Sequence, residues 1–183
     1  PKTASATSMG LVGSEMCRRD SPRRFGSLHL AKDISEHRLI SHLGPEPLSD
    51  DFNDEYLFAI CKKSKTNIKS LIMNQKNVVG IGNIYASEAL YLASVNPNKI
   101  ASKLKKIDCK NITDSSKKIL NAAIKVGGTT LKDFYSADGS PGYFKFKLNV
   151  YGREGLECKK CKKEILKINI NNRATFFCKG CQS

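Results

Sequence analysis

Cys158-Lys-Lys-Cys161 and Cys178-Lys-Gly-Cys181 are two C-x-x-C pairs near the C-terminal end of this 183-residue chain. This spacing lets each short loop bring two sulfur atoms to one metal, and two such loops complete a tetrahedral site, as is typical of structural Zn²⁺. Four thiolates leave no position open to water, so we expect one structural Zn²⁺ and no metal catalysis. The alternating apolar residues of 165–170 predict a β-hairpin between the pairs.

Arg173 lies in the predicted hairpin, in Asn171-Asn-Arg-Ala-Thr-Phe-Phe177, where a metal-held turn can present a guanidinium group to a phosphate. The chain has 31 Lys and Arg against 17 Asp and Glu, a formal net charge of +14. Residues 143–183 contain ten of these basic residues and three of the acidic ones. The charge favours polyanions such as nucleic acids as partners, and an ordinary solvated surface is the alternative.

The remaining composition limits the class of protein. The length suits one domain or two small ones. No apolar run reaches the roughly 20 residues of a membrane span, and no signal-peptide pattern is present, so we expect a cytoplasmic protein with no membrane partner. Cys17, Cys61 and Cys109 form no disulfide framework, which fits a reducing compartment.

Apolar periodicity predicts helices in the middle of the chain. The first contains residues 56–61 and is capped by Ser49 and Asp50. The others are predicted at residues 66–73, 84–93 and 115–126.

Gly80-Ile-Gly82-Asn83 separates the second and third predicted helices. Two glycines let the backbone approach a phosphate closely, and the N-terminus of the next helix offers free N–H donors. A simple turn is the alternative. The lysines ahead of this turn are candidate phosphate contacts, with a solvated helix face as the competing interpretation: Lys63, Lys65 and Lys69.

Six separated stretches occur in the order found in bacterial formamidopyrimidine-DNA glycosylases. They are 20–26 (DSPRRFG), 43–48 (LGPEPL), 79–88 (VGIGNIYASE), 127–134 (GGTTLKDF), 150–155 (VYGREG) and 175–182 (TFFCKGCQ). From about residue 20 onward, the chain therefore resembles the C-terminal two-thirds of that family.

The resemblance implies an α+β fold: a mainly helical helix-two-turn-helix domain, then a β-hairpin zinc ribbon, preceded by a remnant of a β-rich N-terminal domain. The expected divisions are an unmatched and disordered leader (1–19), the remnant with its linker (20–47), the helical domain (48–143) and the ribbon (144–183). The implied activity is excision of oxidised purines, such as 8-oxoguanine and formamidopyrimidines, followed by strand cleavage at the abasic site. The expected partner of this monomer is double-stranded DNA containing damaged bases or abasic sites.

Particular residues match positions of known role in that family. The resemblance gives Asn83, after Gly82, a contact with DNA phosphates beside the lesion, and gives Arg173 phosphate binding and a part in δ-elimination. Arg23 and Phe25 match residues that fill the gap left by the extruded nucleotide, where a guanidinium group and a ring can replace lost pairing and stacking. A strand end with exposed arginines and a core aromatic is the alternative.

Residues 134–143 resemble the loop that closes over the extruded base, and an ordinary surface connection is the alternative. The lesion-loop candidates are Ser136, Ser140, Gly142 and Tyr143.

The N-terminus departs from the family pattern. Pro1 matches the proline whose amine attacks the sugar, but Lys2 stands where the family has glutamate, so coincidence is the simpler interpretation. Ser21 likewise stands in place of an aspartate. A glycosylase/lyase and a non-catalytic, zinc-dependent module that binds damaged DNA both remain open, with an RNA-binding or transcription zinc ribbon as a third hypothesis.

Overall fold

The computed structural model describes residue 33, residues 36–125 and residues 148–183. The chain divides into two units after His37, and every element below belongs to the unit Arg38–Ser183. The domain boundaries predicted from the sequence stay predictions.

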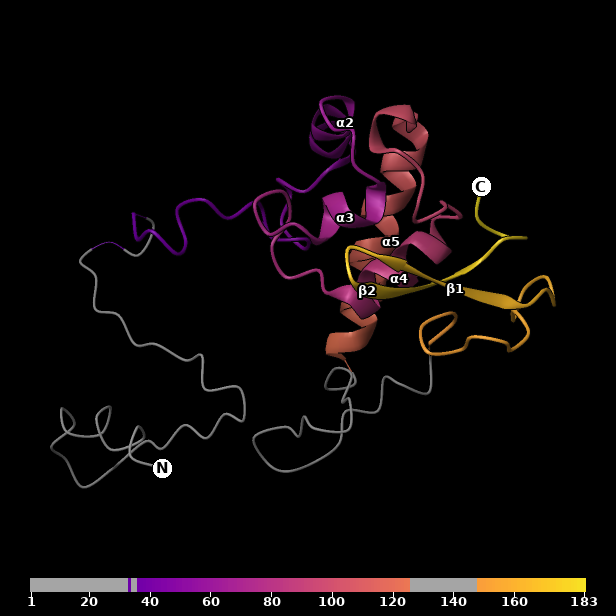
Figure 1. Ribbon diagram of the computed structural model, residues 1–183. Helices are drawn as coiled ribbons and strands as arrows, with labels where there is room; N and C mark the ends of the chain where they lie inside the picture. The colour runs from indigo at the N-terminus through magenta and orange to yellow at the C-terminus, as the bar shows by residue number, and fades with distance from the viewer. Residues whose placement is uncertain (1–32, 34–35, 126–147) are drawn as a thin grey trace, which may run out of the picture. The chain divides into compact units, whose positions relative to one another are not determined.

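The described part of this unit consists of helices followed by a two-stranded antiparallel hairpin (Figure 1). This order confirms the predicted α+β class. The elements are α2 (Asp54–Lys62), α3 (Ile68–Met73), α4 (Asn83–Leu92), the 3-10 turn η1 (Ala101–Lys103), α5 (Lys106–Ile124), β1 (Ile165–Ile170) and β2 (Arg173–Cys178).

Helix α2 begins later than its predicted cap. Asn53 is the N-cap, and its side chain accepts a hydrogen bond of 2.9 Å from the backbone N–H of Tyr56. Ser49 instead donates to the carbonyl of Glu46, at 2.9 Å. The prediction of Ser49 and Asp50 as caps was wrong because the stretch offers several short polar side chains, and the structure uses the last of them.

Helix α5 begins at Lys106, nine residues before the predicted start at Ser115. Its first turn is capped by the Asp108 carboxylate, which accepts a hydrogen bond of 3.0 Å from the backbone N–H of Lys105. Cys109 and Ile112 extend the buried face of the helix toward this end. Polar residues fill most of the first half of α5, so apolar periodicity alone placed the start too late.

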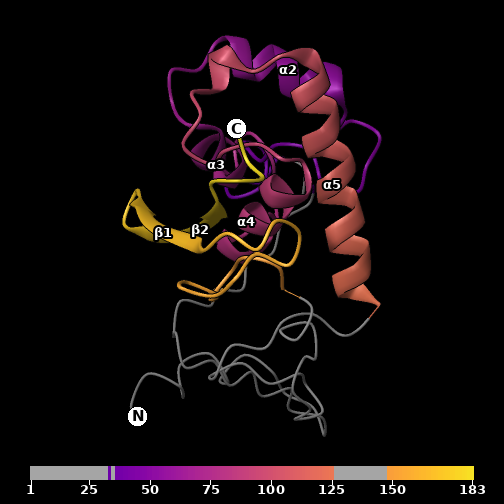
Figure 2. The ribbon, with the colours of Figure 1, turned by 90° about the vertical axis from the view of Figure 1, so that its right-hand side faces the viewer.

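The main core lies between the helices, where α5 packs against α2 and α4 (Figure 2). Large side chains of this core with no exposed surface include Phe52, Leu57, Ile72, Leu90 and Ile112. Burial of each stabilises the fold by about 1.5–3 kcal/mol. Within the described ranges, no helix has both the length and the apolar character needed to cross a membrane.

The predicted hairpin is confirmed, with Ile165 paired to Cys178 at one end and Ile170 paired to Arg173 at the other. Its two-residue turn, Asn171-Asn172, has positive φ angles of 48° and 58°. Such turns match the twist of the strands, and asparagine tolerates this conformation well. The Asn171 side chain also donates a hydrogen bond of 2.8 Å to Ser70 Oγ, which ties the turn to α3.

Glu88 of α4 fixes the segment that leads into the first cysteine loop. Its fully buried carboxylate accepts hydrogen bonds from three consecutive backbone N–H groups, at 2.8 Å from Asn149 and Val150 and at 2.9 Å from Tyr151. A buried carboxylate is costly unless such bonds replace its hydration, and bonds to a charged acceptor are strong. The same helix that follows the glycine turn therefore positions the entry to the hairpin.

Candidate nucleic-acid interface and metal centre

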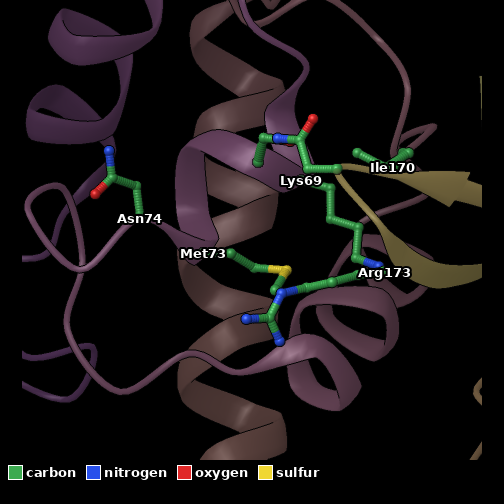
Figure 3. A pocket seen from close by; sticks show the side chains of 7 residues that line it. Lys69, Met73, Asn74, Ile170 and Arg173 are labelled. Atoms are coloured by element: carbon green, nitrogen blue, oxygen red, sulfur yellow. The ribbon is translucent and has the colours of Figure 1, made fainter.

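A pocket of about 180 Å³ lies between α3 and the hairpin (Figure 3). Figure 3 shows Lys69 and Met73 entering it from α3 and Arg173 from the start of β2. Of the residues that the structure describes, none that lines the pocket is acidic: Lys69, Ser70, Met73, Asn74, Ile170, Asn171 and Arg173.

Lys69 is 1% exposed, although lysine side chains are rarely buried in proteins. Its ammonium group donates to Asn83 Oδ1 and Thr175 Oγ1, both at 2.6 Å, and to the carbonyl of Ala174 at 3.3 Å. All three acceptors are neutral and lie on α4 or β2. The solvated-face alternative is therefore wrong for Lys69, which joins three elements instead.

Asn83 is the first residue of α4 and points toward the hairpin. Its amide donates to the carbonyl of Ala174 at 3.0 Å and to the hydroxyl of Tyr151 at 3.4 Å. The preceding turn needs a glycine at position 80, where φ is +84°. A Cβ atom on Gly82 would meet nothing within 4 Å, so the space beside this helix N-terminus is open.

The pocket gathers positive charge. Burial, and then the positive charge of Arg173, lowers the pKa of Lys69 to about 8. Arg173 is exposed, and no residue in the described ranges accepts a hydrogen bond from its guanidinium group. Two neighbouring cations with no carboxylate between them form a site suited to an anion.

The sulfur atoms of Cys158, Cys161, Cys178 and Cys181 all lie within 4.8 Å of one another, so they could hold a metal ion. The Sγ atoms of Cys158 and Cys181 are 3.8 Å apart, and those of Cys161 and Cys178 are 3.3 Å apart. Gly180 is required by this packing, because a Cβ atom there would lie 2.9 Å from the sulfur of Cys161. The four predicted ligands are thus brought together.

Two side chains outside the cysteine set connect this centre to the helical part. Tyr91 of α4 places its hydroxyl 3.2 Å from the sulfur of Cys158. Gln182 accepts from the backbone N–H of Cys178 at 2.8 Å and donates to the carbonyl of Val95 at 2.9 Å. Burial opposes ionisation of Cys158, but hydrogen bonds from Tyr91 and from backbone N–H groups outweigh it and lower the pKa of this thiol to about 6.

The structure therefore brings together three of the predicted site residues, Lys69, Asn83 and Arg173. Lys63 and Lys65 lie exposed between α2 and α3 and do not line the pocket. The other candidates lie outside the described residues: Pro1, Arg23, Phe25, Ser136, Ser140, Gly142 and Tyr143.

The sequence patterns predict no role in this site for Thr175 or Asn171, although Thr175 accepts a hydrogen bond from Lys69 and Asn171 lines the pocket. The asparagine pair was a usable signal for the turn, but nothing in the sequence indicated that Thr175 is an acceptor for a lysine 106 residues away.

The chain matches known proteins over most of its length. Residues 43–135 match the family model described as the formamidopyrimidine-DNA glycosylase H2TH domain. A formamidopyrimidine-DNA glycosylase of Shigella dysenteriae is 46% identical over 182 residues, which cover 100% of this chain and 68% of that protein. One of Hydrogenovibrio crunogenus is 51% identical over 168 residues, covering 91% of this chain and 60% of that protein.

Solved structures agree with these relatives. The crystal structure of the MutM (Fpg) protein of Thermus thermophilus has a TM-score of 0.81 and 38% identity, over 88% of this chain and 62% of that one. The complex of Lactococcus lactis Fpg with DNA containing an abasic site has a TM-score of 0.72 and 40% identity, over 77% of this chain and 52% of that one. The chain thus spans only part of the length of the proteins it resembles.

The lowered pKa of Lys69 predicts a specific dependence on pH. Between about pH 8 and 10.5 the unfolded chain holds a proton on this lysine that the folded chain has lost, so the free energy of unfolding should rise with pH in that window. We expect the Lys69 side-chain resonances to titrate with a midpoint near pH 8 in NMR spectra. The pH-dependent rise in stability should be smaller in Lys69→Met, and a midpoint near 10.5 would contradict the burial described above.

Proposed function

Because the chain belongs to the formamidopyrimidine-DNA glycosylase family, we propose that it takes part in base-excision repair of oxidised purines. In this proposal the pocket between α3 and the hairpin binds the sugar-phosphate backbone of duplex DNA beside a damaged or abasic nucleotide. Family membership disfavours the RNA-binding or transcription alternative, since that hypothesis left the helical motifs unexplained.

One observation supports this proposal most strongly: Lys69 and Arg173 place two positive charges in one pocket, and none of its described lining residues is acidic. A phosphate would offset the repulsion between them. The guanidinium group of Arg173 has the planar geometry for a bidentate contact with phosphate oxygens. Lys69 in turn holds the side chain of Asn83 at the N-terminus of α4, where free N–H groups and the helix dipole favour an anion.

Zinc is the metal that we propose for the four cysteines. Tetrahedral zinc with Zn–S bonds of about 2.3 Å places the sulfur atoms about 3.8 Å apart. The distance of 3.8 Å between Cys158 and Cys181 matches this value, and the 3.3 Å between Cys161 and Cys178 would lengthen by about 0.5 Å on metal binding. When bound, the metal would cross-link the two cysteine loops, and Cys158, Cys161, Cys178 and Cys181 would fill its coordination sphere and leave it a structural role.

The chemistry itself rests on the resemblance. Excision and strand cleavage, with Arg173 assisting δ-elimination, form the first candidate function. Coincidence remains the simpler interpretation of Pro1 as its nucleophile, because Lys2 replaces the family glutamate. A module that binds damaged DNA without catalysis is the second. The same proposal includes void filling by Arg23 and Phe25, closure of the loop 134–143, and phosphate contacts of Lys63 and Lys65. It also includes a cytoplasmic location and the domain divisions 20–47, 48–143 and 144–183. Residues 1–19 fall within the match to the Shigella dysenteriae relative, so the expectation that they are unmatched was wrong.

Replacement of Arg173 tests the phosphate contact. Arg173→Ala should weaken binding to a duplex with an abasic-site analogue and reduce the slope of log K against log salt by about 0.9, the value for one lost phosphate contact. Fluorescence anisotropy over a series of salt concentrations measures both quantities.

Two variants control this experiment. Arg173→Lys keeps the charge but loses the planar fork, so affinity should fall with little change in the salt slope. Lys106→Ala removes an exposed charge from the first turn of α5, where Lys106 pairs with Glu55 of α2, and should leave the slope unchanged. An Arg173→Ala slope equal to that of the unaltered chain removes Arg173 from the interface.

Borohydride trapping on a duplex containing an abasic site separates the two candidate functions. Reduction converts a Schiff base between a protein amine and the sugar into a stable covalent complex. A trapped complex would show that an amine of this chain reaches the sugar and that the chain is a lyase. Binding without any trapped complex would favour the non-catalytic module.

A further inference from the structure

Tyr91, near the C-terminal end of α4, contacts the metal centre from outside the cysteine set. Its hydroxyl oxygen lies 3.2 Å from the sulfur of Cys158. Tyr91 is 1% exposed and Cys158 is fully buried, so water does not compete for this contact. Within the described ranges, no other partner of the Tyr91 hydroxyl is found, and no other side chain except cysteine reaches one of the four sulfur atoms.

The direction of this hydrogen bond follows from the chemistry of the ligand. A cysteine that binds zinc is a thiolate and has no proton to give. The hydroxyl of Tyr91 is therefore the donor, and the sulfur of Cys158 is the acceptor. The backbone N–H of Lys160 donates to the same sulfur at 3.4 Å.

We propose that Tyr91 is an outer-sphere ligand of the zinc, and that its hydrogen bond to the Cys158 thiolate tightens metal binding. The inference rests on the zinc site of the proposed function. Four thiolates around one Zn²⁺ carry an excess of negative charge, which is costly where the ligands are buried, as Cys158 and Cys178 are. A donor that withdraws charge from one sulfur reduces this cost and fixes the orientation of the ligand.

Packing alone does not explain a tyrosine at this position. The ring lies in a buried cluster with Ile165 and Phe176, and the ammonium group of Lys160 lies 5.1 Å from the ring centroid. Phenylalanine would fill the same space and preserve both contacts. The hydroxyl is needed only for the contact with sulfur, so Tyr91→Phe separates the two roles.

The position of Tyr91 gives this contact a consequence for the DNA site. Helix α4 carries Asn83 in its first turn and Tyr91 in its last. The same helix thus contacts Lys69, which lines the pocket, at one end and Cys158 of the metal centre at the other. Tyr91 is therefore a positioning residue through which the metal holds the helix that presents Asn83.

The test is zinc affinity, measured by competition with a chromogenic chelator. Tyr91→Phe should bind zinc about 10- to 100-fold more weakly, the usual effect of losing an outer-sphere partner. Tyr151→Phe is the matched control: it removes a tyrosine hydroxyl from the same cluster, but that hydroxyl lies 3.4 Å from the amide of Asn83 and contacts no sulfur. Its zinc affinity should equal that of the unaltered chain.

A spectroscopic readout distinguishes a hydrogen bond to sulfur from a packing defect. In the cobalt-substituted protein, the sulfur-to-metal charge-transfer band should move to lower energy in Tyr91→Phe and stay unchanged in Tyr151→Phe. Unaltered affinity together with an unaltered band in Tyr91→Phe would overturn the inference. An unaltered chain that binds no zinc would instead overturn the metal site of the proposed function, and this inference with it.

If Tyr91→Phe does not fold, the hydrogen bond from Tyr91 to Cys158 can be tested on the unaltered chain instead. In the cadmium-substituted protein, the buried hydroxyl proton of Tyr91 should show scalar coupling to the metal through the sulfur of Cys158. A visible hydroxyl proton without such coupling would refute the donor role.

Discussion

A buried ammonium group must find acceptors, and the acceptors that Lys69 finds determine how α3, α4 and β2 meet. The side chain is 1% exposed and donates to Asn83, Thr175 and the carbonyl of Ala174. None of these acceptors carries a charge, so no contact among the described residues compensates the positive charge of Lys69. Arg173 adds a second positive charge beside Lys69 in this pocket. A bound anion would balance both charges, which is the physical reason for proposing that the pocket binds a phosphate.

The hairpin that brings Arg173 to this place is too small to be stable alone, since an isolated two-stranded hairpin is marginal in water. It is held at both ends. At the turn, Asn171 binds Ser70 of α3. At the other end, the cysteine loops are fixed by the proposed zinc, by Gln182 bound to the carbonyl of Val95, and by Glu88, which binds the entering segment. Metal binding and the position of Arg173 are therefore coupled.

Local signals in the sequence predicted the local features correctly. The two C-x-x-C pairs predicted the cysteine cluster, the alternation in 165–170 predicted the hairpin, and the glycines before Asn83 predicted the start of α4. Each of these features depends on residues close together in the chain. The start of α5 was misplaced because its first half is mostly polar, even though Cys109 and Ile112 are fully buried there.

The residues that join the elements were not predictable in this way. Lys69 is a residue type that ordinarily lies on the surface, yet it is buried here and its acceptor Thr175 lies 106 positions away. Glu88 and Tyr91 contact segments 61 to 67 positions away. Periodicity reports which face of an element is apolar and carries no information about such partners, so only the folded structure shows these contacts.

The most direct test of this account is the affinity of the chain for a duplex with an abasic-site analogue, measured before and after a chelator removes the metal while circular dichroism monitors helix content. If the metal-held hairpin delivers Arg173 to Lys69 and Asn83, affinity should fall in step with metal loss, helix content should persist, and added zinc should restore binding. A metal-free chain that binds the duplex with unchanged affinity and salt dependence would contradict the account.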